Sequence, residues 1–127
     1  MYIEQLYTNC LAEAAYYIES EGQAAIIDPL RETEPYITLA KKRGASIKYV
    51  FETHFHADFV SGHIDLSRKV NAPIVYGPDA EPQYDVINAK DDVILRFSIR
   101  TIHNRCMVLM LNLSMTSSMQ RMGRNLY

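Results

Sequence analysis

Glu52-Thr53-His54-Phe55-His56-Ala57-Asp58-Phe59-Val60-Ser61-Gly62-His63 holds three of the chain's four histidines and its only dense group of metal-capable side chains. His54 and His56 are separated by one residue, and Asp58 follows after one more. Imidazole and carboxylate groups are the protein ligands of Zn²⁺ and of non-haem iron. We therefore predict a metal site at His54, His56 and Asp58, with Asp58 also a candidate catalytic carboxylate. A solvated loop that carries histidines without a metal is the alternative.

The residues around this stretch predict an α/β fold. The run Ile-Lys-Tyr-Val-Phe at 47–51 is typical of a buried strand, so the metal-capable residues would follow its carboxyl end, where α/β folds place their sites. Apolar residues recur at helical spacing both after the stretch and before the strand. The helix before the strand has Pro35 in its first turn and Gly44 as its stop signal. The expected elements are strands at 2–6, 14–20, 24–28, 47–51, 73–76 and 97–103, helices at 32–43 and 60–70, and a loop entering a strand at 85–90.

Composition bounds the class of protein. The chain has 127 residues, enough for one domain with a real core, and a formal net charge of −2, which favours neither nucleic acid nor an anionic membrane as partner. No apolar run is long enough to span a bilayer, and the N-terminus lacks the pattern of a signal peptide. Cys10 and Cys106 are few and far apart, which suits a reducing compartment. We therefore expect a cytoplasmic protein.

Thr53 to Asp58, followed by Ser61-Gly62, resembles the first metal motif of the metallo-β-lactamase superfamily, Thr-His-X-His-X-Asp-His. With Ala57 before the aspartate and Ser-Gly after it, the motif is most similar to that of the persulfide dioxygenases. The resemblance runs from Tyr2 to about Asp91 and more faintly to His103. One position departs from the motif, because Phe59 stands where the superfamily usually has histidine.

The resemblance implies the N-terminal half of a four-layer αββα fold, an incomplete metallo-β-lactamase-like domain over residues 1–103. It also implies that an aspartate such as Asp28, which ends a predicted strand before Pro29, lies near the metal. A strand-ending aspartate that caps a turn is an equally good interpretation of Asp28. His63 is expected to be a polar residue that opens the following helix.

For a persulfide dioxygenase, the resemblance implies one Fe(II) held by His54, by a later histidine and by a distant aspartate, with His56 and Asp58 near the metal. The reaction would oxidise a thiol persulfide, such as glutathione persulfide, to sulfite and thiol, and a rhodanese domain often accompanies the enzyme. Dizinc hydrolases of the superfamily bind a second metal through the motif aspartate and the histidine that follows it. This chain has Phe59 at the position of that histidine, which argues against two metals. A zinc hydrolase resembling glyoxalase II is the alternative.

The later metal motif, Thr-Pro-Gly-His, is missing after Ile102-His103, and His103 matches a non-ligand histidine of the family. With ligands from one loop only, we expect weak metal binding or none, so an inactive fragment is the alternative to an enzyme. An interaction module built on the methionine-rich tail is a further alternative.

The tail at residues 104–127 has the marks of a frameshift. From Val93 onward the chain has five arginines but no lysine and no acidic residue. From Met107, joining the last base of each codon to the first two of the next permits Gly-Pro-Asp-Ala-Glu-Pro-Gln-Tyr-Asp-Val-Ile-Asn-Ala-Lys-Asp, which is the sequence of residues 77–91. We infer that the tail is an out-of-frame copy of that segment. A genuine C-terminus is the alternative.

Overall fold

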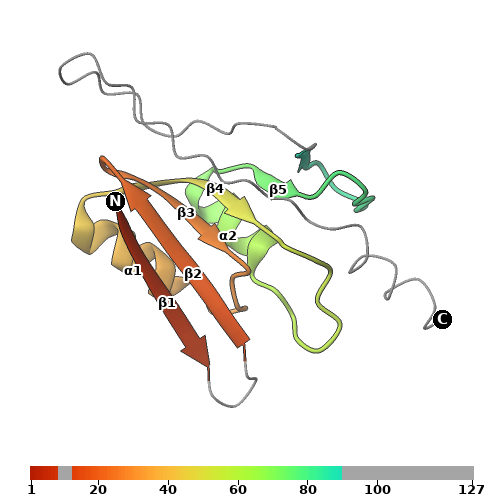
Figure 1. Cartoon of the computed structure of the whole chain (residues 1–127), viewed down its shortest axis with the longest axis horizontal. Coiled ribbons are helices and arrows are strands. Elements are labelled where there is room, and N and C mark those ends of the chain that lie inside the picture. The colour runs from red at the N-terminus through yellow and green to blue at the C-terminus, as the bar shows by residue number, and fades with distance from the viewer. Residues whose placement is uncertain (9–12, 90–127) are drawn as a thin grey trace.

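The computed structural model describes residues 1–8 and 13–89 of the chain (Figure 1). The predicted strand at 97–103, the tail at 104–127 and both cysteines lie outside these residues. The described part forms one six-stranded sheet in the order β1-β2-β3-β4-β5-β6. Its elements are β1 (Tyr2–Thr8), β2 (Glu13–Ser20), β3 (Gln23–Ile27), α1 (Glu34–Arg43), β4 (Ser46–Phe51), α2 (His63–Val70), β5 (Ile74–Tyr76) and β6 (Ile87–Asn88).

Strands β1, β2 and β3 pair antiparallel, whereas β3, β4, β5 and β6 pair parallel. The β2–β3 hairpin turns at Glu21 and Gly22, which both have positive φ, at 50° and 75°. Two-residue hairpin turns favour this backbone because its twist matches that of the strands. Helix α1 joins β3 to β4 and helix α2 joins β4 to β5, as expected for crossover connections. The predicted α/β class is therefore confirmed.

Both helices cover the same face of the sheet, as Figure 1 shows. Helix α1 has Pro35 in its first turn and ends at Gly44, whose φ of 70° places it in the left-handed region. The helices pack with the strands into one core of buried side chains, formed by Ala15, Tyr17, Ala24, Ile26, Tyr36, Ala40, Ile47, Val50, Leu66 and Ala72. A smaller cluster contains Ala25, Phe51 and Val75 from the strands together with Ala89, which follows β6.

Two predicted helix boundaries were wrong by a few residues. Helix α1 begins at Glu34 rather than at residue 32, and α2 begins at His63 rather than at residue 60. Ser61 forms an isolated antiparallel bridge with Leu30, and the Gly62 amide donates to the Pro29 carbonyl at 2.9 Å. These contacts hold Ser61 and Gly62 against residues 29–30, outside the helix, which sequence periodicity does not reveal.

The parallel pairing of β3 and β4 positions the candidate site. Ile27 pairs with Phe51, and the Asp28 amide donates to the Phe51 carbonyl at 2.9 Å. The residues that follow the two strands therefore lie side by side at the carboxyl end of β3 and β4. Asp28 from β3 meets the loop that starts at Glu52 after β4.

Candidate metal centre

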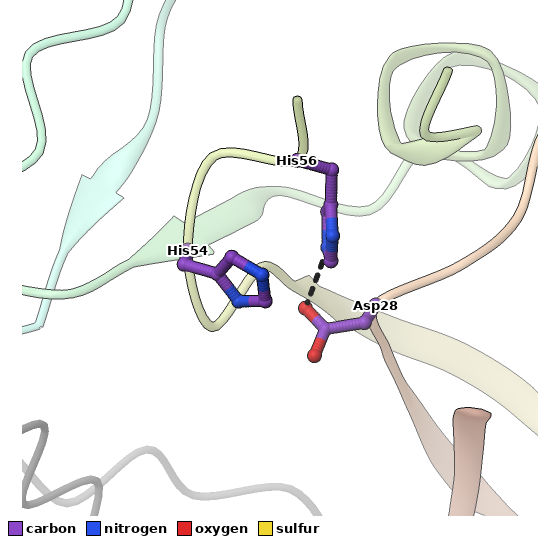
Figure 2. A group of neighbouring side chains, drawn as sticks. All are labelled: Asp28, His54 and His56. Atoms are coloured by element: carbon purple, nitrogen blue, oxygen red, sulfur yellow. Dashed lines mark ion pairs between the residues drawn. The ribbon is translucent and has the colours of Figure 1, made fainter. Parts of the chain in front are cut away.

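Asp28, His54 and His56 converge at the carboxyl end of β3 and β4 (Figure 2). One ligand atom from each lies within 4.8 Å of the other two. Both ring nitrogens of His56 are buried and have no hydrogen-bond partner in the part of the chain that the structure describes. Two imidazoles and a carboxylate, with an imidazole left unsatisfied, fit Zn²⁺ or non-haem iron. The three side chains could therefore hold one metal ion.

The Asp28 carboxylate is fixed by the first residue of the metal motif. It accepts a hydrogen bond from the Thr53 amide at 2.7 Å and another from the Thr53 hydroxyl at 2.6 Å. Asp28 itself has a φ of 49°, an uncommon conformation for a residue other than glycine. These bonds aim the carboxylate at the loop that carries the two histidines.

The same hydroxyl determines the tautomer of His54. Thr53 Oγ1 lies 2.8 Å from His54 Nδ1. Because a hydroxyl has one hydrogen, which goes here to Asp28, Oγ1 accepts from Nδ1–H. The lone pair of His54 is then at Nε2, where it is available to a metal.

The charges at the site favour an ionised Asp28. Burial alone would raise its pKa, but the contact with the His56 imidazole and the hydrogen bonds from Thr53 outweigh burial and hold the pKa below its ordinary value. Burial alone would lower the pKa of His56, but the carboxylates of Asp28 and Glu52 outweigh it and raise the pKa. The closest atoms are His56 Nε2 and Asp28 Oδ1, 3.4 Å apart. Such a site attracts a proton or a metal cation.

Glu52 is a second acid behind the histidines, and no role was predicted for it from the sequence. Its side chain is 1% exposed, and Oε1 accepts from the Ser61 hydroxyl at 2.7 Å. Oε2 lies 3.5 Å from His56 Nε2, and Oε1 lies 3.5 Å from His63 Nδ1. Burial raises the pKa of Glu52 to about 8, against the opposing effect of the Ser61 bond. The sequence signal that could have identified Glu52 is its position directly after a predicted buried strand.

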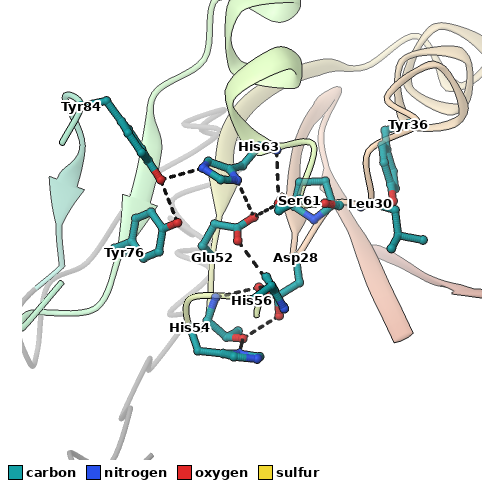
Figure 3. Close-up of polar contacts among 12 residues, drawn as sticks. Asp28, Leu30, Tyr36, Glu52, His54, His56, Ser61, His63, Tyr76 and Tyr84 are labelled. Atoms are coloured by element: carbon teal, nitrogen blue, oxygen red, sulfur yellow. Dashed lines mark hydrogen bonds and ion pairs between the residues drawn. The ribbon is translucent and has the colours of Figure 1, made fainter. Parts of the chain in front are cut away.

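His63 is the first residue of α2, as expected, and lies outside the converging group of three. Its Nε2 is 2.6 Å from the Tyr84 hydroxyl, which is 3.0 Å from the Tyr76 hydroxyl (Figure 3). Burial and the nearby charge of His56 lower the pKa of His63. The two tyrosines were not recognised from the sequence as neighbours of the site.

Asp58 is exposed and is not one of the three residues that converge. Of the residues predicted as ligands, the structure therefore brings together His54 and His56, and Asp28 supplies the carboxylate beside them. The ring of Phe59 packs against His56, with centroids 4.3 Å apart and planes tilted by 42°. The metal roles of these residues, and the catalytic role of Asp58, stay predictions.

Residues 8–85 match the family model of the metallo-beta-lactamase superfamily. The chain belongs to this superfamily. Among curated proteins it is similar to the hydroxyacylglutathione hydrolase of Pelagibacter ubique, at 29% identity over 91 residues, covering 67% of the chain and 38% of the relative. It is also similar to the cytoplasmic hydroxyacylglutathione hydrolase of Arabidopsis thaliana, at 34% identity over 86 residues, covering 65% of the chain and 33% of the relative.

Two solved structures share the fold of this superfamily member. A metallo-beta-lactamase from Staphylococcus aureus superposes with a TM-score of 0.67 at 31% identity, covering 76% of the chain and 31% of that protein. ETHE1 from Myxococcus xanthus superposes with a TM-score of 0.68 at 25% identity, covering 76% of the chain and 44% of that protein. The predicted superfamily is thus confirmed, and the chain spans between a third and two fifths of the length of the two curated relatives.

None of the helices that the structure describes is both long enough and apolar enough to cross a bilayer.

Proposed function

We propose that this chain is part of a single-metal persulfide dioxygenase, which oxidises a low-molecular-weight thiol persulfide such as glutathione persulfide. In the overall reaction, RSSH, O₂ and H₂O give RSH, sulfite and two protons. The outer sulfur loses four electrons, and O₂ takes them up. The similarity to ETHE1, a persulfide dioxygenase, supports this choice within the superfamily.

Phe59 is the observation that carries the proposal. The residue after the motif aspartate would be the ligand of a second metal in a dizinc hydrolase, and a phenyl ring has no donor atom. The ring also packs on His56, so it fills space beside the candidate ligands rather than leaving it for another ion. One metal with open positions suits oxygen chemistry, whereas hydrolases of this type use two.

His54, His56 and Asp28 would hold the metal, which we propose to be Fe(II), with Zn²⁺ as the alternative. When bound, Fe(II) supplies a centre at which O₂ and a sulfur ligand can meet. The protein contributes the rest: Thr53 holds Asp28 in place, and Phe59 shields one side of His56 from water. An accompanying rhodanese domain and a cytoplasmic location are further predictions of this proposal.

A zinc-dependent hydrolase is the second candidate, because the curated relatives at 29% and 34% identity are named hydroxyacylglutathione hydrolase. Both candidates would act on a derivative of glutathione, so the metal and the reaction distinguish them. Hydrolysis breaks a thioester and consumes no oxygen.

Metal content and oxygen uptake test the proposal. The chain is loaded anaerobically with Fe(II) or Zn²⁺, its metal content is measured, and it is then given glutathione persulfide with an oxygen electrode or a glutathione thioester with a thiol reagent. If the chain acts as the proposed enzyme, it should bind at most one metal, weakly, with oxygen uptake and sulfite in the iron form. No bound metal and no oxygen uptake would favour the inactive fragment. Phe59→His is the matched variant and should raise the zinc content toward two. Two zinc ions in the unmodified chain, with thioester hydrolysis, would favour the second candidate.

A further inference from the structure

We propose that two copies of this chain associate through β1, whose outer edge pairs antiparallel with the same strand of a second copy. The pair is centred on Gln5, which then faces Gln5 of the second copy. Such a pair joins two six-stranded sheets into one continuous sheet around a two-fold axis. The surface does not include the candidate metal ligands, so the proposal holds for either of the reactions considered above.

Strand β1 lies at one end of the sheet in the part of the chain that the structure describes (Figure 1). All seven of its residues pair with β2 in one unbroken register, and none of them is proline or lysine. Short length, a bulge, proline and lysine are devices by which edge strands avoid pairing with another chain. The opposite end strand, β6, has only two residues, whereas β1 has none of these devices. The outer edge of β1 is therefore open to strand pairing.

The exposed side chains of β1 carry no charge. Ile3 and Tyr7 are each 55% exposed, and Gln5 between them is also exposed. The three share one face of the strand, because successive side chains of a strand alternate between faces. A second copy centred on Gln5 sets Ile3 opposite Tyr7 twice, once on each side of the axis. Cross-strand pairs of an aromatic and a β-branched residue stabilise a sheet.

The sequence of β1 is complementary to itself in this register and not in the neighbouring ones. Centred on Gln5, all seven residues are paired, and Glu4 faces Leu6 rather than its own copy. A pair centred on Glu4 would set two carboxylates directly opposite each other, which destabilises a sheet. A pair centred on Leu6 would leave Ile3 outside the paired strands and set Tyr7 opposite Gln5. This self-complementarity is the reason for assigning a second copy of the chain to the edge.

A cavity next to β1 extends the apolar surface beside the interface. Its volume is about 690 Å³, and its lining includes Glu4 and Leu6 of β1, Tyr36 of α1 and Phe59. Leu6 packs against the core between the sheet and the helices, so Glu4 and Leu6 face the helix side of the sheet. In the proposed register, Leu6 of the second copy faces the same side, directly beside Glu4. The second copy thereby adds an apolar side chain next to the cavity.

Sedimentation velocity of the 127-residue chain over a range of concentrations measures the association. One strand from each copy buries less surface than a standard protein interface, so the dimer should be weak and concentration-dependent. We expect a reversible equilibrium between monomer and dimer. A monomer at every concentration would overturn the proposal. Open-ended assembly beyond the dimer would also overturn it, because a two-fold pair closes on itself.

Charges placed at Gln5 test the register. Gln5→Lys and Gln5→Glu each set like charges opposite each other, and each should weaken self-association at least about 5-fold. An equal mixture of the two variants sets opposite charges there and should restore the dimer, which a folding defect cannot do. Ile87→Lys is the matched control, because it charges an exposed apolar residue of the opposite end strand. Failure of the mixture to associate, or equal weakening by Ile87→Lys, would refute the proposal.

Disulfide cross-linking identifies the paired residues. In a chain with Cys10→Ser and Cys106→Ser, Gln5→Cys should form a linked dimer under mild oxidation, because the two sulfurs face each other across the axis. Ile3→Cys should link to Tyr7→Cys in a mixture of the two variants but not to itself, since its own copy lies four positions farther along the strand. Self-linking of Ile3→Cys as fast as that of Gln5→Cys would contradict the register.

Discussion

Replacing Gly62 with alanine should destabilise the fold through a steric clash rather than through backbone strain. The φ of Gly62 is −86°, which any residue can adopt, but a Cβ there would lie 2.2 Å from the Leu30 carbonyl oxygen, where ordinary contact begins at 3.4 Å. The obstructing atoms are all backbone, so no side chain can rotate away. Relief requires the start of α2 to separate from residues 29–31.

The expected cost combines two effects. Overpacking a tight contact costs about 1–3 kcal/mol. Separation also weakens the bond from the Gly62 amide to the Pro29 carbonyl, worth about 1 kcal/mol net. We therefore expect Gly62→Ala to lower the free energy of unfolding by about 2–4 kcal/mol. Weaker Zn²⁺ binding should accompany this loss, because Asp28 adjoins the displaced segment.

Urea unfolding followed by circular dichroism measures this cost, and Gly44→Ala is the control. Gly44 has a φ of 70°, but a Cβ there meets nothing within 4 Å. Its replacement should therefore cost about 1 kcal/mol, from left-handed strain alone. If Gly62→Ala cost no more than Gly44→Ala, the close contact between Gly62 and the Leu30 carbonyl would be refuted.

Three further predictions concern charges. Glu52 has a raised pKa, so in the metal-free chain the folded state binds its proton more tightly than the unfolded state does. The free energy of unfolding should therefore fall as pH rises from 4.5 toward 8, by at most about 1.4 kcal/mol per pH unit. Urea unfolding at several pH values should show this dependence, and Glu52→Gln should remove it. Asp28 has a lowered pKa, so its contribution is present at neutral pH and disappears as pH falls through that pKa; Asp28→Asn should cost about 1.5–3 kcal/mol at neutral pH and little in acid. Arg43→Met should lower the free energy of unfolding only slightly, and less still in high salt, because its pairing with Glu19 is partly exposed; urea unfolding at low and high salt measures this.

The local signals in the sequence sufficed for most elements. Glycine and proline mark turns and helix ends through backbone conformations that depend on neighbouring residues only, as at Gly22, Pro35 and Gly44. The start of α2 was missed because Ser61 and Gly62 are held by contacts with residues about 30 positions earlier in the chain. No periodicity within residues 60–70 carries that information.

The site divides in the same way. His54 and His56 were predicted as ligands because both lie in one short motif, and the structure brings them together. Asp28 was weighed evenly between a turn cap and a metal neighbour, since its place beside Thr53 depends on β3 pairing with β4. Tyr84 was missed because its contact with the site is made through His63, 21 positions away. A motif identifies ligands, but the groups that orient them come from the tertiary fold.

The two histidines of the His-X-His motif have different polar partners. The ring centroids of His54 and His56 lie 4.2 Å apart, and the ring planes are tilted by 54°. Asp28 acts on His54 through the Thr53 hydroxyl and leaves the lone pair at Nε2. His56 instead lies between the two acids, with Nε2 3.4 Å from Asp28 Oδ1 and 3.5 Å from Glu52 Oε2. Because Asp28 and Thr53 set the tautomer of His54, Glu52→Gln should leave that tautomer unchanged in histidine-selective ¹⁵N NMR, whereas Asp28→Asn should change it.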